Sequence, residues 1–287
     1  WLIPHFDKGA LYRSAFFTKA YPNMIPSPQQ DKDFPWWLLV AAGIGVFFLY
    51  RIMTDDLHAQ ILGTLSKGVR ITIFVTLIGF ALASILGLLL ALGSMSKYLI
   101  IRQITRFYVE IVRGIPMMVL LLYVAFVLAP ALVALRNYLG EAVGLDPIRM
   151  RDFSLLWRAI IALMIGYSAF IAEVFRAGLQ AVDPGQIEAA NALGLSRWQR
   201  FRFVVFPQAI RMILPPLGND FIAMIKDSSL VSVLGVLDVT QLGKVTAAGN
   251  FRYFETYNVV ALVYLFMTVT LSLLLRRLEA HLRAKRG

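Results

Sequence analysis

The sequence contains no cysteine and only three histidines among its 287 residues. It therefore offers no disulfide and no thiol chemistry. The histidines, His5, His58 and His281, are scattered, and no cluster of His, Cys and carboxylate residues has the spacing of metal ligands. No Gly-x-Ser-x-Gly segment marks a nucleophile elbow. We therefore expect neither a metal site nor a catalytic residue in this chain.

A loop for nucleotide phosphates is also missing. The nearest approach runs from Gly63 to Gly68, but Val69 stands where such a loop requires lysine. We therefore expect the chain to hold no cofactor and not to bind ATP itself.

Charge is scarce, because charged residues make up 16% of the chain and hydrophobic residues 59%. Soluble domains carry about 25% charged residues. The net charge of +11 would suit a nucleic-acid partner. The lysines and arginines, however, gather at the ends of apolar runs, as they do in membrane proteins. The composition therefore predicts a protein of the lipid bilayer, without a nucleic-acid partner.

Long apolar runs are what the sequence has in abundance. A membrane helix needs about 20 mostly apolar residues. Five runs qualify: Trp36–Met53, Ile71–Met95, Tyr108–Ala129, Trp157–Gly178 and Val259–Leu275. A sixth, between Phe203 and Val239, is interrupted by Pro207, Pro215 and Pro216. We predict an all-α, polytopic membrane helical bundle of about six transmembrane helices.

The distribution of positive charge orients these helices. With the N-terminus inside, the inner segments carry about twice as many Lys and Arg residues as the outer ones, which places both termini in the cytoplasm. In the outer segment Ala131–Leu156 we expect a short surface helix and turn, or alternatively a contact for an external binding protein. Residues 1–35 fit either a cytoplasmic tail or a segment along the membrane interface.

A polar, basic segment from 183 to 207 interrupts the apolar runs. Asp183 can cap a helix, Pro184 suits its first position, and Gln186 stands where a capping-box partner belongs. We therefore predict that this segment is folded.

Two further signals divide this segment into a short helix-turn-helix. Gly194 suits a left-handed helix end. Ser196 and Gln199 form a second capping box. Such an element, exposed to water, can receive force from a soluble partner, although a solvated helical loop is the simpler alternative.

Two charged residues stand inside a predicted membrane helix. A charge at the bilayer centre costs roughly 2.5–3.5 kcal/mol on insertion scales. Glu110 and Arg113 are three residues apart and can pair on one face. They form either a structural ion pair or part of a transport path that offers both signs of charge. Pro116 is expected to bend this helix or leave a carbonyl free.

The second candidate for a path is the Pro215–Pro216 helix break. Prolines leave upstream carbonyls without partners, and broken membrane helices face protein or a watery cavity. The alternatives are a kink satisfied by neighbouring helices and a gate or substrate wall. The polar residues that follow are Asn219, Asp220, Lys226, Asp227, Ser228 and Ser229, among which Asn219, Lys226 and Ser228 are preferred.

Several motifs resemble one known family. Glu188-Ala189-Ala190, followed by Gly194 and by Pro207-Gln208, resembles the EAA loop of permease subunits of bacterial ABC importers. The flanks resemble the polar amino-acid branch, at Tyr108–Pro116, Ala172–Gly178, Leu214–Asp220 and Lys226–Leu230. The resemblance runs from about Gly63 to the C-terminus. The chain departs from it at Ile115, where relatives more often carry a hydroxyl residue, and in a longer segment between Pro130 and Trp157.

This resemblance implies a type I importer fold with five core helices and one extra N-terminal helix. It implies two permease subunits, as a homodimer or with a similar partner, two ATPase subunits that bind ATP and Mg, and an external solute-binding protein. It also implies that the complex lies in the bacterial inner membrane and that it transports a polar amino acid. The small residues of the first short helix would let the ATPase approach closely. The residues implied in coupling are Gly185, Glu188, Ala189, Ala190, Leu193 and Gly194.

The expected organisation has four parts. Residues 1–35 form an N-terminal segment, 36–62 the extra helix and a linker, 63–280 the permease domain, and 281–287 a basic tail. Two rival functions stay open at this point. A gradient-driven secondary transporter or channel would be favoured by an inverted repeat, which we do not find. A membrane scaffold or signalling subunit would tolerate neutralisation of Glu110 and Arg113.

Overall fold

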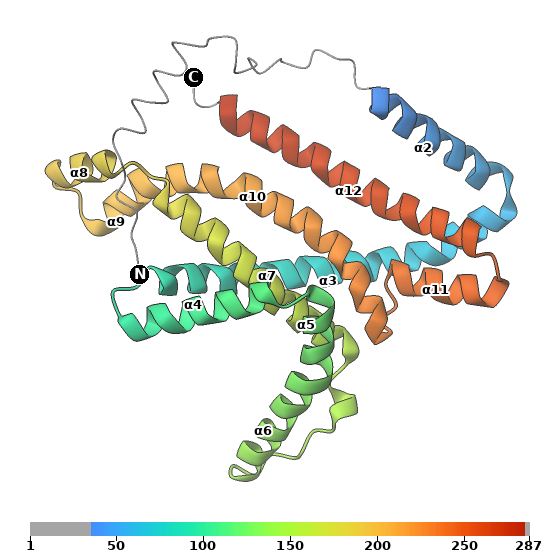
Figure 1. The fold of residues 1–287 in the computed structure, drawn as a ribbon, viewed down its shortest axis with the longest axis horizontal. Helices are drawn as coiled ribbons and strands as arrows, with labels where there is room; N and C mark the ends of the chain where they lie inside the picture. The colour runs from blue at the N-terminus through green and yellow to red at the C-terminus, as the bar shows by residue number, and fades with distance from the viewer. Residues whose placement is uncertain (1–35, 285–287) are drawn as a thin grey trace, which may run out of the picture. The chain divides into compact units, whose positions relative to one another are not determined.

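The computed structural model describes residues 36–284, and these residues form helices and connecting turns without a strand (Figure 1). The chain divides into two compact units, residues 1–47 and 48–287, and the second holds every helix after α2. The predictions for residues 1–35 and for the end of the basic tail fall outside the described residues. The elements are α2 (Trp36–Thr54), α3 (Asp56–Ser94), α4 (Leu99–Gly114), α5 (Met117–Tyr123), η1 (Val124–Leu128), α6 (Ala129–Glu141), η2 (Met150–Asp152), α7 (Leu155–Gln180), α8 (Pro184–Ala192), α9 (Arg197–Arg200), η3 (Phe201–Val205), α10 (Phe206–Asp227), η4 (Ser228–Leu234), α11 (Val239–Asn250) and α12 (Tyr253–Ala284).

Four helical segments in the described part are long and apolar enough to cross a membrane. They are Asp56–Ser94, Met117–Glu141, Leu155–Gln180 and Tyr253–Arg277. The all-α membrane fold is thereby confirmed. Of the other two expected spans, α2 contributes only the shorter apolar stretch Ala42–Thr54, and α10 is long enough but too polar to belong to this set.

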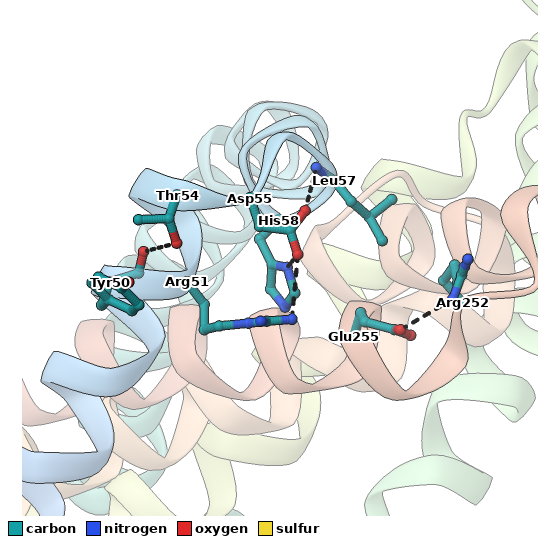
Figure 2. Close-up of polar contacts among 8 residues, drawn as sticks. All are labelled: Tyr50, Arg51, Thr54, Asp55, Leu57, His58, Arg252 and Glu255. Atoms are coloured by element: carbon teal, nitrogen blue, oxygen red, sulfur yellow. Dashed lines mark hydrogen bonds and ion pairs between the residues drawn. The ribbon is translucent and has the colours of Figure 1, made fainter.

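The first long span begins earlier than the sequence predicted. We expected a helix from Ile71 and an outer loop before it, whereas α3 begins at Asp56. Asp55 supplies the reason, because its Oδ1 accepts a hydrogen bond from the backbone N–H of Leu57 at 3.0 Å and so caps the helix (Figure 2). Residues 63–68 are therefore helical and form no phosphate-binding loop.

The same carboxylate ties α3 back to the end of α2. Its Oδ2 lies 2.9 Å from Nδ1 of His58, which is buried, and 3.3 Å from Nη2 of Arg51 (Figure 2). The hydrogen bond from Leu57, then the His58 and Arg51 contacts, hold the pKa of Asp55 below its ordinary value. Asp55 therefore caps α3 and, at the same turn, contacts the side chains of His58 and Arg51.

Pro116 divides the expected span Tyr108–Ala129 into two helices. α4 ends at Gly114, Ile115 is extended with φ −95° and ψ 128°, and α5 begins at Met117. A residue that precedes a proline disfavours helical φ and ψ angles, so the helix is expected to break at Ile115. The predicted bend at Pro116 is confirmed, but the apolar span starts at Met117 and continues through η1 and α6 (Figure 1).

The core of the second unit lies where α3 packs along α7. Gly87 of α3 is at the closest approach, because a Cβ there would lie 2.8 Å from Cγ2 of Ile171. The core cluster that includes Ile171 also holds Leu121, Ile160 and Leu163, which are fully buried. α4, α10, α11 and α12 also contact α3, so this long helix is the axis of the unit.

α10 contradicts the predicted break at Pro215 and Pro216. The helix continues through both prolines to Asp227, and only then tightens into η4 and ends at Gly235, whose φ is +80°. The two rings remove the hydrogen bonds to the carbonyls of Arg211 and Met212, but the rest of the helix and its packing on α7 and α12 maintain the fold. The interruption lies about three turns beyond the predicted position.

The segment after α6, from Ala142 to Ser154, folds back onto this helix. The Asn137 amide donates to the carbonyl of Ile148 at 2.8 Å and accepts from its N–H at 3.0 Å. Gly144 makes the reversal with φ +72°. The predicted surface helix and turn are therefore present, although the helical part continues the membrane span rather than forming separately.

Candidate functional site

The predicted helix-turn-helix is present in the segment from 183 to 207. Asp183 caps α8, with Oδ1 accepting from the N–H of Gly185 at 2.7 Å, and Pro184 is the first helical residue. Gly194 reverses the chain in the left-handed conformation with φ +73°. The Ser196–Gln199 capping box opens α9. Each of these local signals is confirmed.

Gln186 does not act as the predicted capping-box partner of Asp183. Its side-chain carbonyl instead accepts a hydrogen bond from the amide of Gln208, at the start of α10. Gln208 also donates to the carbonyl of Val204 at 3.0 Å. The side chain of Gln186 therefore ties α8 to α10 rather than closing its own first turn.

One face of α8 points outward and the other packs on the body of the protein. Gly185, Glu188, Ala189 and Leu193 are exposed, and Leu193 retains 80% of its accessible surface. Ala190, by contrast, is only 3% exposed and packs on the body of the protein. Its position follows from helical periodicity, since it lies on the inward face with Ile187.

Two further contacts fix α8 to the helix that follows it. Ile187 packs against a small apolar cluster formed by Val182, Ala209 and Ile213. Arg200 of α9 donates to the side-chain carbonyl of Asn191. α9, η3 and α10 follow one another without a gap, so they form one continuous helical stretch.

Glu110 and Arg113 do not form the ion pair that their spacing predicted. Both are exposed on α4, and the described residues contain no contact between them within ion-pair distance. The guanidinium of Arg113 instead lies over the ring of Phe170 on α7, 5.8 Å from its centroid. A cation over an aromatic face is attracted by the ring quadrupole, and α4 packs on α7 closely enough to allow it.

A neighbouring ion pair on α7 was absent from the predicted site. Nε of Arg176 lies 3.3 Å and 3.2 Å from the two carboxylate oxygens of Glu173, and Nη1 donates to Gln180 at 2.9 Å. Both partners are about one-third exposed. Their spacing of three residues within the motif Ala172–Gly178 was the signal that could have identified them.

The polar residues at the end of α10 occupy different environments. Asn219 and Lys226 are exposed, whereas Ser229 is half-buried. Ser228 is fully buried, and its hydroxyl donates to the carbonyl of Ile225 at 2.7 Å. The structure thus brings Asn219 and Lys226 to the surface of the single chain and leaves Ser228 inside it.

Tyr167 connects this region to α7 and was missed by the sequence analysis. Its hydroxyl donates to Oδ2 of Asp227 at 2.8 Å. Asp220 lies two turns earlier on the same helix, α10. Its Oδ2 is buried and has no hydrogen-bond partner in the described part of the chain. Asp227 thus has a partner on α7, whereas this buried oxygen of Asp220 has none among the described residues.

A second tyrosine links α4 to α7. The hydroxyl of Tyr108 shares a hydrogen bond of 2.9 Å with Ser168 and lies 3.2 Å from the carbonyl of Ile165. The charged and aromatic residues of α4, α7 and α10 are in this way positioned by hydrogen bonds between helices. No group of three or more His, Cys, Asp and Glu side chains among residues 36–284 has the geometry of a metal site.

Comparison with known proteins gives a consistent result. The family described as "Binding-protein-dependent transport system inner membrane component" matches residues 83–286. The chain is 36% identical over 219 residues to the glutamine transport system permease protein GlnP of Escherichia coli strain K12, which covers 76% of this chain and 93% of that protein. It is 32% identical over 220 residues to the L-cystine transport system permease protein TcyL of Bacillus subtilis strain 168, covering 77% and 87%.

Solved structures show the same fold. A crystal structure of an amino acid ABC transporter with histidines has a TM-score of 0.65 and 35% identity to this chain, over 78% of this chain and 96% of that one. An inward-facing form of the MetNI methionine ABC transporter has a TM-score of 0.57 at 20% identity, over 80% and 99%, and bears on the fold alone.

Proposed function

The chain belongs to the family of inner membrane components of binding-protein-dependent transport systems, and we propose that it carries a polar amino acid inward in an ATP-driven importer. As a family member it is a permease subunit, and a gradient-driven transporter or a passive scaffold is not favoured. The named substrates of its relatives, glutamine and cystine among them, support an amino acid as the cargo.

The observation that carries this proposal is the mechanical connection of α8. Its outer face is free, with Glu188 and Leu193 available to a partner. Its inner face is fixed to the start of α10 through Ile187 and Gln186. The far end of α10 carries Asp227, which is bound to Tyr167 of α7. A displacement of α8 is therefore transmitted to the polar residues within the bundle.

We assign the outer face of α8 to an ATPase subunit at the cytoplasmic side. The coupling residues are Gly185, Glu188, Ala189, Leu193 and Gly194, with Ala190 acting from the inner face as a packing residue. Two ATPase subunits would bind ATP and Mg, two permease subunits would enclose one path, and an external binding protein would deliver the amino acid. ATP shifts the equilibrium between two states only if it binds one of them better.

We place the translocation path along the polar side of α10 and the facing parts of α4 and α7. α10 has length enough to cross the bilayer but carries Arg211, Asp220, Lys226 and Asp227. Such a helix is stable in a membrane only where its charges face protein or water. The charges of the Glu173–Arg176 pair, which is about one-third exposed, and of Arg113 also face protein or water. In this proposal, Glu110, Asn219 and Ser229 line or border the path, and Ser228 supports its wall.

We further propose residues 63–280 as the permease domain, with 36–62 as an additional N-terminal helix and linker. The boundary at residue 62 lies within α3, so the linker is the first part of a continuous helix. Both termini are assigned to the cytoplasm from the distribution of Lys and Arg.

The test is to purify the chain with its ATPase, reconstitute the complex in lipid, and add binding proteins loaded with single amino acids. Stimulated hydrolysis with one loaded binding protein would support the importer and identify its cargo. Glu188→Lys should abolish that stimulation while leaving insertion and folding intact, whereas Glu141→Lys, at the opposite side, serves as the matched charge control. Unchanged uptake in Glu188→Lys would contradict the role of α8.

A further inference from the structure

A row of exposed aromatic side chains lies on the helical segment that follows α8. Trp198 stacks on Phe201, with ring centroids 5.9 Å apart and an interplanar angle of 29°, and Phe201 contacts Phe206 at 5.9 Å. Their side chains are 66%, 39% and 48% exposed. We refer to Trp198, Phe201 and Phe206 as the aromatic row. Three neighbouring aromatic rings that are exposed in the single chain indicate that this surface lies in a partly apolar environment.

Two arginines flank this row. Arg197 stands four residues before Phe201, and Arg202 four residues after Trp198, so each shares a helix face with a ring of the row. Both are exposed, and neither forms an ion pair or a side-chain hydrogen bond within residues 36–284. Two guanidinium groups beside an apolar strip are therefore available to bind an anion.

Trp198 points away from the side of α9 that contacts α8. Arg200 reaches Asn191 of α8, and it is two residues from Trp198, which places the two side chains on opposite sides of the helix. The side that carries Trp198 is thus not the side that contacts α8. This arrangement leaves Trp198 outside the contact between α9 and α8.

The position of the row matches the boundary between membrane and water. It ends at Phe206, the first residue of α10, the helix that we place in the bundle across the bilayer. Aromatic rings and arginines gather at that boundary because the rings are amphipathic and the guanidinium reaches the headgroups. The cytoplasmic leaflet is rich in anionic lipids, and basic groups near it are attracted to them.

We propose that the aromatic row, with Arg197 and Arg202, binds the phosphate headgroup of an anionic phospholipid in the inner leaflet. The rings lie against the upper acyl chains and the two guanidinium groups bind the phosphate, since Arg presents paired donors that match its oxygens. The lipid is thereby held beside η3, which joins α9 to α10. The proposal rests on the cytoplasmic placement of this segment.

The experiment uses Trp198 as its own reporter. The other four tryptophans, Trp1, Trp36, Trp37 and Trp157, are replaced by Phe, and the full chain is placed in nanodiscs of neutral phosphatidylcholine. Brominated phosphatidylglycerol or brominated phosphatidylcholine is then added in increasing fractions while Trp198 fluorescence is measured. We expect quenching at a clearly lower fraction of phosphatidylglycerol.

Variants at the two arginines test the contact itself. In Arg197→Gln/Arg202→Gln the preference for phosphatidylglycerol should fall by about thirtyfold, because each of the two basic groups contributes roughly 1 kcal/mol near an anionic surface and about 1.4 kcal/mol is a factor of ten. Arg197→Lys/Arg202→Lys should retain most of it. The matched control is Arg149→Gln/Arg151→Gln, which removes two arginines from the segment that we place on the outer side of the membrane. It should leave the preference for phosphatidylglycerol unchanged.

Two results would overturn the proposal. Equal quenching by the two brominated lipids in the parent chain would show no anionic site, whatever the variants do. Loss of ATPase co-purification in Arg197→Gln/Arg202→Gln, with the lipid preference intact, would assign this surface to the ATPase instead. Because the lipid measurement needs only this chain, it stays decisive even if the proposed transport function fails.

Discussion

The hydroxyl of Tyr167 donates a hydrogen bond of 2.8 Å to Asp227, and this bond joins the middle of α7 to the last residue of α10. It lies in the packed region between the two helices, on the polar side of α10. We assign this bond to the coupling of α10 movement with α7.

Tyr167→Phe should therefore impair transport more than it impairs folding. Loss of one such hydrogen bond costs about 1–2 kcal/mol, which a well-packed bundle tolerates. We expect reduced uptake with ATPase stimulation altered, measured in proteoliposomes, and only a small drop in thermal midpoint. Tyr123→Phe, at an exposed position, is the control. Equal effects of the two variants on uptake would contradict the assigned role.

Ile187→Ala and Leu193→Ala should separate anchoring from docking on α8. Ile187 packs on the protein body, so its truncation loosens the connection to α10 by about 1–2 kcal/mol and should uncouple hydrolysis from uptake. Leu193 is exposed, so its truncation should weaken ATPase binding. ATPase co-purification and the ratio of uptake to hydrolysis are measured for both. Identical profiles would refute the division of α8 into two faces.

Gly68→Ala should destabilise the bundle, because an added Cβ would lie 2.7 Å from the backbone of Asp238 and Val239. Backbone atoms cannot move aside as a flexible side chain can, and we expect a loss of about 1–3 kcal/mol in the free energy of unfolding. Gly63→Ala is the matched control on the same helix, with open space around its position. It should be neutral or stabilising by about 0.5–1 kcal/mol. Thermal unfolding in detergent distinguishes the two.

Asp55 should make the α2–α3 turn sensitive to acid. Its pKa is lowered in the folded state, so its stabilisation is complete above the ordinary carboxyl pKa and is lost as pH falls through the lowered value. The thermal midpoint of the parent should therefore decline between pH 5 and the acid limit, about pH 3, more steeply than that of Asp55→Asn. Asp56→Asn, at the exposed neighbouring carboxyl, should keep the parental dependence. Coincident curves for the parent and Asp55→Asn would exclude this role.

The family and the membrane fold were predictable because their signals are local. The cap at Asp183, the left-handed Gly194 and the Ser196–Gln199 box each depend on a few adjacent residues, and all are confirmed. The resemblance to importer permeases is likewise confirmed. Such features can be predicted without knowing which distant residues contact them.

The errors arose where a distant partner decides the outcome. Gln186 follows the capping-box pattern, yet Gln208 binds it across the turn. Glu110 and Arg113 have helical pair spacing, yet Phe170 on another helix attracts the arginine. Tyr167 gives no local signal of its bond to Asp227, 60 residues away. The roles assigned to the path residues stay predictions.

The contact between α3 and the start of α11 has a consequence for how the protein is made. The N–H of Val239 donates to the hydroxyl of Thr72 at 3.3 Å, although the two residues are 167 positions apart. The surface of α3 around Gly68 therefore stays uncovered while most of the chain leaves the ribosome. The bundle is therefore complete only after its C-terminal part has been synthesised.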